Sequence, residues 1–252
     1  MRIAVVVFPG TNCDQETRYV FGDVLGQDVE PVWHADTDLA RFDAIVLPGG
    51  FSYGDHLRAG AIARFSPVMR TVAELARRDR IVIGICNGFQ VLCEAGLLPG
   101  ALLPNAGGSF ASQWVNCRVE DAGSALTRGV AVGTVLRLPI AHGEGRYVAP
   151  PETLAALEQH GQIVFRYTEA DGTVTDRANP NGSALNIAGI RSAGGNVVGL
   201  MPHPERAAED ELPSHDGLPL LRALIGASAS ATAAPSPSSL VGVAASSRTA
   251  AR

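Results

Sequence analysis

The chain has 252 residues, 46% of them hydrophobic, and a net charge of −5 at pH 7. This size and composition suffice for one large α/β domain whose sheet is covered on both faces. The acidic balance, with no basic cluster interleaved with aromatic residues, argues against a nucleic-acid partner. All 20 basic residues are arginine, which excludes a Walker phosphate loop and lysine Schiff-base chemistry. Any chemistry of nucleotide triphosphates is therefore expected on another chain.

Four apolar runs are continuous rather than alternating, which is typical of strands buried on both faces. They are residues 3–8, 44–47, 81–85 and 197–200. Between the first three runs, residues 17–25 and 61–80 have the length and apolar spacing of crossover helices. The resulting β-α-β-α-β-α order predicts a flavodoxin-like, doubly wound, mostly parallel sheet.

The middle of the chain has a different pattern. Residues 114–119 and 135–140 alternate between apolar and polar side chains, which predicts antiparallel strands added to the parallel core. From residue 226 the composition becomes rich in alanine and serine, which bury too little apolar surface to offset the entropy of ordering. We therefore expect one domain over residues 1–225 and a disordered tail over residues 226–252.

The pentapeptide 84–88, Gly-Ile-Cys-Asn-Gly, closes the third apolar run and opens a helical stretch. A strand, a sharp turn and a helix in this order form a nucleophile elbow, here with Cys86 at its tip. The flanking glycines allow the tight turn, and the positive end of the helix favours the thiolate of Cys86. Cys86 is therefore predicted to be a nucleophile.

The fourth apolar run leads directly into Pro202-His203-Pro204-Glu205. Each proline biases the residue before it toward extended geometry, in which residues two apart project the same way, so His203 and Glu205 can form a hydrogen bond. The carboxylate would fix the tautomer of His203 and leave its other ring nitrogen for Cys86. We predict a triad of cysteine, histidine and glutamate.

Ligands of doubly wound sheets gather outside the carboxyl ends of the strands, where three loops of this chain should meet. These loops are residues 9–13, residues 48–52 and the elbow. Attack of the thiolate on an amide carbonyl creates an oxyanion, which the backbone N–H groups of Asn87 and of Gly50 could receive. Residues 141–147, with glycines between His, Glu and Arg, could bring backbone donors to a polar ligand or could be only a turn.

Other chemically capable residues have weaker signals. Cys93 and Cys117 fit core positions, whereas Cys13 could be structural or functional because its loop faces the expected cleft. The spacing of His and Cys residues matches no usual metal-ligand pattern, so no metal site is expected. The remaining histidines, read as surface residues, are His34, His56, His160 and His215.

The motifs of the elbow, of residues 48–50 and of residues 203–205 together resemble those of class I glutamine amidotransferases. Residues 8–14, 48–55 and 141–146 narrow the resemblance to the glutaminase subunits of phosphoribosylformylglycinamidine synthases, which act in purine biosynthesis. The similarity covers residues 1–224. It implies that Cys86 attacks the side-chain amide of glutamine and that ammonia is released through a thioester. The glutamine-binding residues that it implies are Gly49, Gln90, His142, Gly143 and Glu144.

The resemblance also implies partners. A large synthetase subunit would use ATP and Mg²⁺ to convert formylglycinamide ribonucleotide into its amidine with this ammonia, and a small subunit would bridge the two. No cofactor is expected in this chain itself. Arg146 and Arg206 could contact the glutamine carboxylate or a partner, or could form surface ion pairs.

Cellular location and two rival functions are judged from further sequence features. The absence of a signal peptide, of a C-x-x-C pair and of an apolar run near 18 residues predicts a cytoplasmic protein with reduced thiols and no membrane partner. A cysteine hydrolase of the deglycase type would also place its cysteine on an elbow, but it would carry the histidine just after the cysteine. A glutamine sensor without activity would not need a nucleophile.

Overall fold

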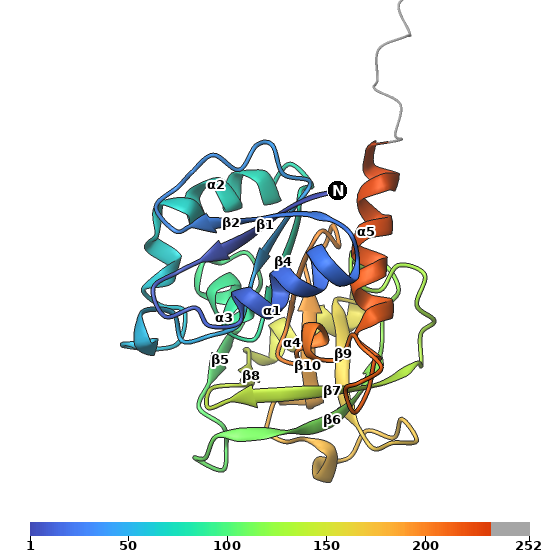
Figure 1. Cartoon of the computed structure of the whole chain (residues 1–252). Helices are drawn as coiled ribbons and strands as arrows, with labels where there is room; N and C mark the ends of the chain where they lie inside the picture. The colour runs from blue at the N-terminus through green and yellow to red at the C-terminus, as the bar shows by residue number, and fades with distance from the viewer. Residues whose placement is uncertain (233–252) are drawn as a thin grey trace, which may run out of the picture.

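The computed structural model describes residues 1–232 and is built around one nine-stranded sheet (Figure 1). Half of this sheet is parallel, in the order β2-β1-β3-β4-β11, with β1 between β2 and β3 as in flavodoxin-like folds. The sequence predicted this arrangement, except that it did not identify β2. The parallel strands are β1 (Arg2–Val7), β2 (Asp28–Trp33), β3 (Ala44–Leu47), β4 (Ile81–Ile85) and β11 (Val197–Leu200).

The other half of the sheet continues from β11 as antiparallel strands in the order β10-β9-β6-β7. The two stretches predicted from alternation pair with each other as β6 and β7, which confirms that prediction. The sheet is nevertheless mixed rather than mostly parallel. The bounds are β6 (Ala111–Val119), β7 (Val135–His142), β9 (Ile163–Thr168) and β10 (Ile187–Arg191), while β5 (Ala101–Leu103) and β8 (Arg146–Val148) form a separate two-stranded sheet.

Helices cover the parallel half. The predicted helix over residues 17–25 is α1 (Asp14–Tyr19), which continues as the π-helical turn η1 (Val20–Val24). The one predicted over residues 61–80 is shorter, because Pro67 starts a new helix after the 3₁₀ turn η3 (Ala63–Phe65). The remaining α-helices are α2 (Pro67–Ala76), α3 (Asn87–Glu94), α4 (Pro151–Gln159) and α5 (Leu218–Thr232).

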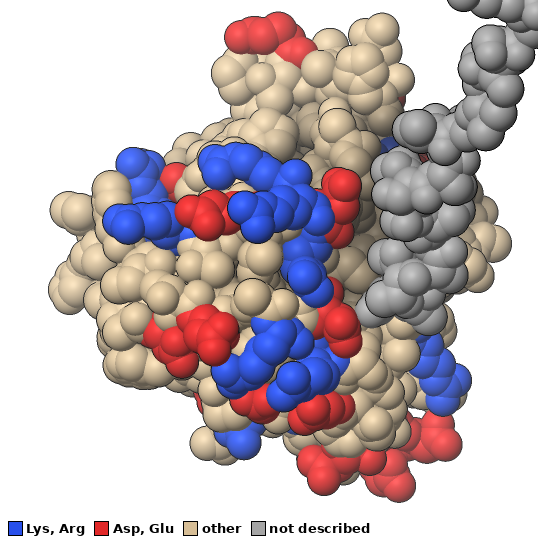
Figure 2. Space-filling view, turned by 90° about the horizontal axis from the view of Figure 1, so that it is seen from above, with Lys and Arg blue, Asp and Glu red and all other residues tan. Residues whose placement is uncertain are grey.

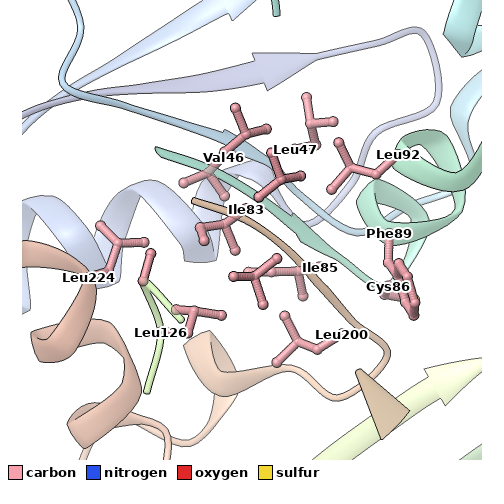
Figure 3. Packing of buried hydrophobic residues seen from close by; sticks show 14 of the residues in the cluster. Val46, Leu47, Ile83, Ile85, Cys86, Phe89, Leu92, Leu126, Leu200 and Leu224 are labelled. Carbon is pink, nitrogen blue, oxygen red and sulfur yellow. The ribbon is translucent and has the colours of Figure 1, made fainter. Parts of the chain in front are cut away.

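The central strands β3, β4 and β11 are apolar along their whole length because both of their faces are covered. Figure 3 shows Leu126 and Leu224 on one side of these strands and Phe89 and Leu92 of α3 on the other. All four side chains are buried. Since burying one such side chain contributes about 1.5–3 kcal/mol, this two-sided packing fixes the strand ends on which the site is built.

Helix α5 differs from the expectation for the C-terminal region. The sequence predicts a disordered tail from residue 226, but the structure places residues 226–232 in α5. The alanines of this segment favour helix, and Ala227 is buried in the core. Residues 233–252 lie outside the described residues. None of the helices within residues 1–232 combines the length and the hydropathy that spanning a bilayer requires.

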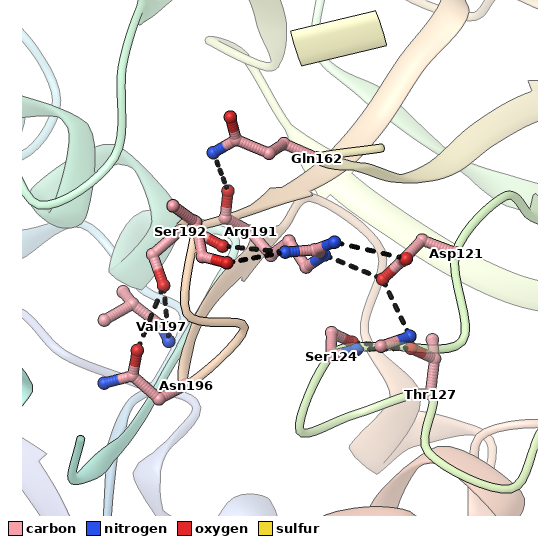
Figure 4. A network of polar contacts seen from close by, with 10 residues as sticks. Asp121, Ser124, Thr127, Gln162, Arg191, Ser192, Asn196 and Val197 are labelled. Atoms are coloured by element: carbon pink, nitrogen blue, oxygen red, sulfur yellow. Dashed lines mark hydrogen bonds and ion pairs between the residues drawn. The ribbon is translucent and has the colours of Figure 1, made fainter. Parts of the chain in front are cut away.

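A polar network lies at the end of the sheet where the central strands β4 and β11 begin (Figure 4). Arg191 pairs with Asp121 at 2.8 Å, and Nδ2 of Asn196 donates to the carbonyl oxygens of Ala76 and Arg80 at 2.8 and 3.0 Å. These contacts close the ends of α2 and β10 far from the carboxyl ends of the parallel strands. On the face seen in Figure 2, basic and acidic side chains are interspersed rather than segregated.

Candidate active site

The predicted site residues follow four strands that are neighbours in the sheet. Cys86 comes directly after β4, the loop 48–50 follows β3, residues 9–13 follow β1, and His203 follows β11. Because these strands are parallel, their carboxyl ends lie along one edge. The topology therefore brings together groups that are more than a hundred residues apart in sequence.

Cys86 lies at the N-cap of α3 with φ of 51° and ψ of −106°, a backbone conformation that non-glycine residues rarely adopt. Close packing of the two flanking glycines makes the turn possible. A Cβ atom on Gly88 would lie 1.9 Å from the carbonyl oxygen of Leu47, and one on Gly84 would lie 2.6 Å from the Gly88 backbone. The elbow predicted from the sequence is thus present, with its strain at the expected nucleophile.

His203 and Glu205 are joined by a hydrogen bond of 2.6 Å between Nδ1 and Oε1, as the sequence predicted from their spacing. Both residues are buried, with exposed fractions of 1% and 2%. Burial acts to lower the pKa of His203, but the charges of Glu205 and of the Cys86 sulfur outweigh it and raise this pKa above its usual value. The surroundings of His203 therefore favour its imidazolium form.

The opposite ring nitrogen, Nε2 of His203, has no hydrogen-bond partner of standard geometry within residues 1–232. The Cys86 sulfur is close enough to act on the pKa of His203, yet its hydrogen-bond contact is the carbonyl oxygen of Ala141, at 3.7 Å. Catalytic hydrogen bonds are often misaligned before substrate binds.

The two backbone N–H groups predicted to receive the oxyanion belong to Asn87 and Gly50. Asn87 is the first residue of α3, and the first N–H groups of a helix have no acceptor within it. Gly50 follows β3, has φ of 145° and forms an isolated β-bridge with Thr11. The neighbouring Gly49 packs closely on the histidine, because a Cβ atom there would lie 2.8 Å from Cε1 of His203.

Gln90 and Glu144 meet across the two halves of the sheet. Nε2 of Gln90 donates to the carbonyl oxygen of Glu144 at 2.6 Å, and Nδ2 of Asn87 donates to Oε1 of Gln90 at 2.8 Å. The Glu144 carboxylate in turn accepts from the Ala59 backbone N–H at 3.2 Å. The elbow helix is therefore tied directly to the glycine-rich segment that follows β7.

His142 is buried next to the glycine-rich segment. Its ring is 2% exposed and lies beneath the segment 143–145, with Nδ1 3.1 Å from Oδ1 of Asn105 and Nε2 3.5 Å from Nδ2 of Asn181. Burial, assisted by the charge of His203, lowers the pKa of His142 to about 4. The ring is therefore neutral and held by two amide side chains.

The amides under this segment were missed by sequence reasoning. Oδ1 of Asn105 accepts from the Gly145 N–H at 3.0 Å, and Nδ2 of Asn181 donates to the Gly145 carbonyl oxygen at 2.8 Å. Asn181 is also held by Ser183, whose hydroxyl donates to Oδ1 at 2.8 Å. The turn residues around Asn181 were the only signal in the sequence, and turn residues alone do not indicate a role beside a site.

Asp55 is a second residue without a predicted role. It belongs to the turn η2 (Ser52–Asp55), has φ of 53°, and lies 3.4 Å from Nδ2 of Asn87. Burial, followed by the negative charge of Glu144, raises the pKa of Asp55 to about 6. The Asp55 carboxyl group thus lies near enough to Glu144 to be affected by its charge.

The remaining cysteines and histidines are mostly structural. All four cysteines are free, and Cys93 and Cys117 are buried core residues, as predicted. His34 contacts the Tyr53 hydroxyl at 3.0 Å, and the exposed His215 pairs with Asp210 at 2.9 Å. Within residues 1–232 there is no group of three or more His, Cys, Asp or Glu residues that could hold a metal ion.

Comparisons with known proteins place this geometry in a family. Residues 1–216 match the CobB/CobQ-like glutamine amidotransferase domain. The phosphoribosylformylglycinamidine synthase subunits PurQ of Moorella thermoacetica and Aquifex aeolicus are 55% and 54% identical to the chain. Each alignment covers 89% of this chain, and 95% and 99% of the respective relatives.

A solved structure of PurLQS from Thermotoga maritima superposes with a TM-score of 0.79 at 40% identity, covering 89% of this chain and 97% of the matched chain. The expected class I amidotransferase architecture is therefore confirmed. The chain belongs to the CobB/CobQ-like glutamine amidotransferase family, as a relative of the PurQ subunits of phosphoribosylformylglycinamidine synthase.

Proposed function

We propose that this chain hydrolyses glutamine to glutamate and ammonia and delivers the ammonia to a synthetase subunit. That subunit would convert formylglycinamide ribonucleotide into formylglycinamidine ribonucleotide with ATP, in purine biosynthesis. The observation that carries the proposal is the coupling of Cys86 on a strained elbow to the buried pair of His203 and Glu205, in a chain 55% identical to a PurQ subunit.

The triad accounts for the chemistry in two steps. The Cys86 thiolate attacks the amide carbon of the glutamine side chain, and the imidazolium of His203 gives its proton to the departing nitrogen, which leaves as ammonia. The thioester then reacts with water, from which neutral His203 takes a proton. Glu205, bonded to Nδ1, stabilises the imidazolium and keeps Nε2 directed toward sulfur and substrate.

Oxyanions form in both steps, and the N–H groups of Asn87 and Gly50 would receive them. One such donor typically lowers the barrier by about 3 kcal/mol. The position of Asn87 at the helix N-terminus adds a favourable dipole to its N–H group.

The substrate would lie between the elbow helix and residues 143–145. Gly49, Gln90, Gly143 and Glu144 would contact glutamine, and the existing hydrogen bond from Gln90 to Glu144 keeps these two sides at a fixed spacing. We assign His142 a supporting role, because its neutral ring fills the space under the loop.

The proposed partners are inferred from the relatives. The PurQ name and the PurLQS assembly support a large synthetase subunit and a small bridging subunit as partners of this chain. ATP and Mg²⁺ would bind to the synthetase, since this chain has no lysine for a phosphate loop. A cytoplasmic location follows from that pathway and stays a prediction.

The low exposure of Cys86 supports the proposal that the site becomes active when the chain docks onto the synthetase. Cys86 is 5% exposed and His203 is 1% exposed, so glutamine reaches the sulfur only after some movement of the surrounding loops. Ammonia released into water at neutral pH would become ammonium, which is not a nucleophile. Activity that depends on the docked synthetase would prevent this loss.

Copurification with the synthetase, followed by glutaminase assays with and without it, tests the proposal. We expect the isolated chain to be slow and the complex to produce one amidine for each glutamate. Glutamate release without any amidine, or amidine made only from added ammonia, would contradict the proposal. Glutamine that binds without being hydrolysed in the complex would favour the sensor hypothesis instead.

A further inference from the structure

Arg206 joins the turn that carries the histidine and glutamate to a distant helix. It is the last residue of η6 (Pro204–Arg206) and directly follows Glu205. Its Nε and Nη2 atoms donate to Oε1 of Glu16, in the first turn of α1, at 2.9 and 2.6 Å. A single guanidinium therefore attaches η6 to α1, although the two segments are 190 residues apart.

The same guanidinium contacts Cys13, whose role the sequence left open. Nη2 of Arg206 donates to Sγ of Cys13 at 3.0 Å, and Cys13 is the N-cap residue of α1. Burial raises the pKa of this thiol, so it stays neutral, donates to Oδ1 of Asn12 at 3.4 Å and accepts from Arg206. Cys13 is thus a contact residue and not a second nucleophile.

Cys13 in turn holds the loop that contains the expected oxyanion donor. Its backbone N–H donates to the carbonyl oxygen of Gly49 at 3.2 Å. A Cβ atom on Gly49 would lie 2.9 Å from Sγ of Cys13 and 2.8 Å from Cε1 of His203, so thiol and imidazole pack on the same side of Gly49. A continuous chain of contacts runs from Glu16 through Arg206 and Cys13 to the loop beside the histidine.

Resting on the function proposed above, we propose that Arg206 is a positioning residue, held by Glu16 and Cys13, that fixes the His203–Glu205 pair against the Gly49–Gly50 loop. The base and the oxyanion donor come from opposite parts of the sequence. Their relative placement decides how well the transition state is stabilised, and an error of about 1 Å can lower the rate a hundredfold. Glutamine itself would bind on the side of Gln90 and Glu144, which Arg206 does not touch.

The test is Arg206→Met in the complex reconstituted with the synthetase. We expect kcat of the glutamine-dependent reaction to fall by about 10- to 100-fold, while KM for glutamine changes by less than about twofold. Ammonia-dependent activity should be unchanged. Arg206→Lys keeps the charge but has no second nitrogen to replace the Nε contact with Glu16, so its loss should be smaller than that of Arg206→Met.

Labelling of Cys86 by the diazoketone analogue of glutamine gives a second readout. Arg206→Met should lower the maximal labelling rate constant and leave the half-saturating concentration of the analogue unchanged. Glu16→Gln keeps the shape of the partner and removes its charge. Since Arg206→Met removes the contact that Glu16→Gln weakens, their effects should be less than additive when combined.

Arg41 offers a matched control. It pairs with Glu30 at 2.6 Å, with side-chain exposures of 38% and 35%, against 2.6 Å, 36% and 32% for Arg206 and Glu16. Arg41→Met should therefore have the kinetics of the wild type. If both methionine variants lose activity equally, the loss reflects surface charge or stability, and the inference is wrong.

Other outcomes separate the inference from the function on which it rests. A normal kcat in Arg206→Met, or a rise in KM without a fall in kcat, overturns the positioning role and leaves the proposed function intact. A wild-type complex without glutamine-dependent activity removes the proposed function before any variant is compared. If Arg206→Met does not fold, Glu16→Gln takes its place in the test. A fall in kcat with an unchanged KM supports the positioning role, and an unchanged kcat overturns it.

Discussion

The parallel and antiparallel halves of the sheet contribute to the site in different ways. The parallel half presents Cys86, His203 and the loop 48–50 at the ends of fully buried strands, so backbone topology alone brings these groups together. The antiparallel half presents residues 143–145, which depend on buried side-chain amides for their shape. Reactive groups are thus placed by strand order, whereas the expected substrate contacts are placed by a polar network.

The largest effect is expected from the parallel half. Cys86→Ala removes the nucleophile and should lower glutamine-dependent amidine formation by about a thousandfold or more, because no other group can form the thioester. Ammonia-dependent formation should persist, since it bypasses this chain. Assays of the reconstituted complex with each nitrogen source check this, and Cys93→Ala on the same helix is the control. Loss of both activities would contradict the proposal that this chain releases the ammonia and the synthetase subunit uses it.

The base should contribute almost as much. His203→Ala removes the imidazole that stabilises the thiolate, and we expect labelling of Cys86 by the glutamine analogue to slow by about 100-fold or more. The measurement is the rate of covalent modification followed by mass spectrometry. Undiminished labelling would remove His203 from the mechanism and would leave the parallel half with a nucleophile alone.

The sequence predicted the parallel half well because its signals are local. The strands β3, β4 and β11 are unbroken apolar runs. The glycines on both sides of Cys86 indicate a tight turn, in which a Cβ atom at either position would clash with the backbone. Proline on both sides of His203 also restricted the backbone locally. Each of these inferences needed only a few neighbouring residues.

The other half could not be predicted to the same depth. Asn105 and Asn181 come from different loops and meet only through the pairing of distant strands, and nothing in a single sequence indicates which buried amide faces which carbonyl. The same limit applies to His142, whose polar side chain pointed to a ligand contact although it is buried under the loop. The contact of Arg206 with Glu16 spans 190 residues and left no local signal either.

The buried His142 makes stability depend on pH. Its pKa in the folded state is about 4, below the usual 6.5, because burial and then the charge of His203 oppose protonation. The unfolded chain therefore binds the proton first, and the folded state should lose roughly 3 kcal/mol as pH falls from about 6.5 to about 4. Denaturant unfolding at pH 7 and pH 4.5 measures this loss.

His142→Gln keeps hydrogen-bonding capacity without a group that titrates in this range, so it should flatten the pH dependence of unfolding. The exposed His160→Gln is the control and should leave the dependence unchanged. An equal slope in the wild type and His142→Gln would show that the ring is not protonated on unfolding in this range.

The smallest predicted effect compares the amide under the substrate loop with the one at the far edge of the sheet. Asn181→Ala leaves the Gly145 carbonyl oxygen without its 2.8 Å donor, and Asn196→Ala does the same to the carbonyl oxygen of Ala76. Each loss should destabilise folding by about 1–3 kcal/mol. Only Asn181→Ala should also raise KM for glutamine, by about tenfold, because it loosens the loop on which Glu144 lies.

The pair separates a structural role from a role in binding, since each variant removes an asparagine amide that donates to a backbone carbonyl oxygen. Steady-state kinetics of each complex, at a temperature where both variants are folded, gives the two KM values. If KM rises equally in both, general loss of rigidity explains the effect and the two halves are not functionally distinct. If it rises in neither, the loop keeps its shape without Asn181, and the hydrogen bond from Gln90 to Glu144 must suffice to hold it.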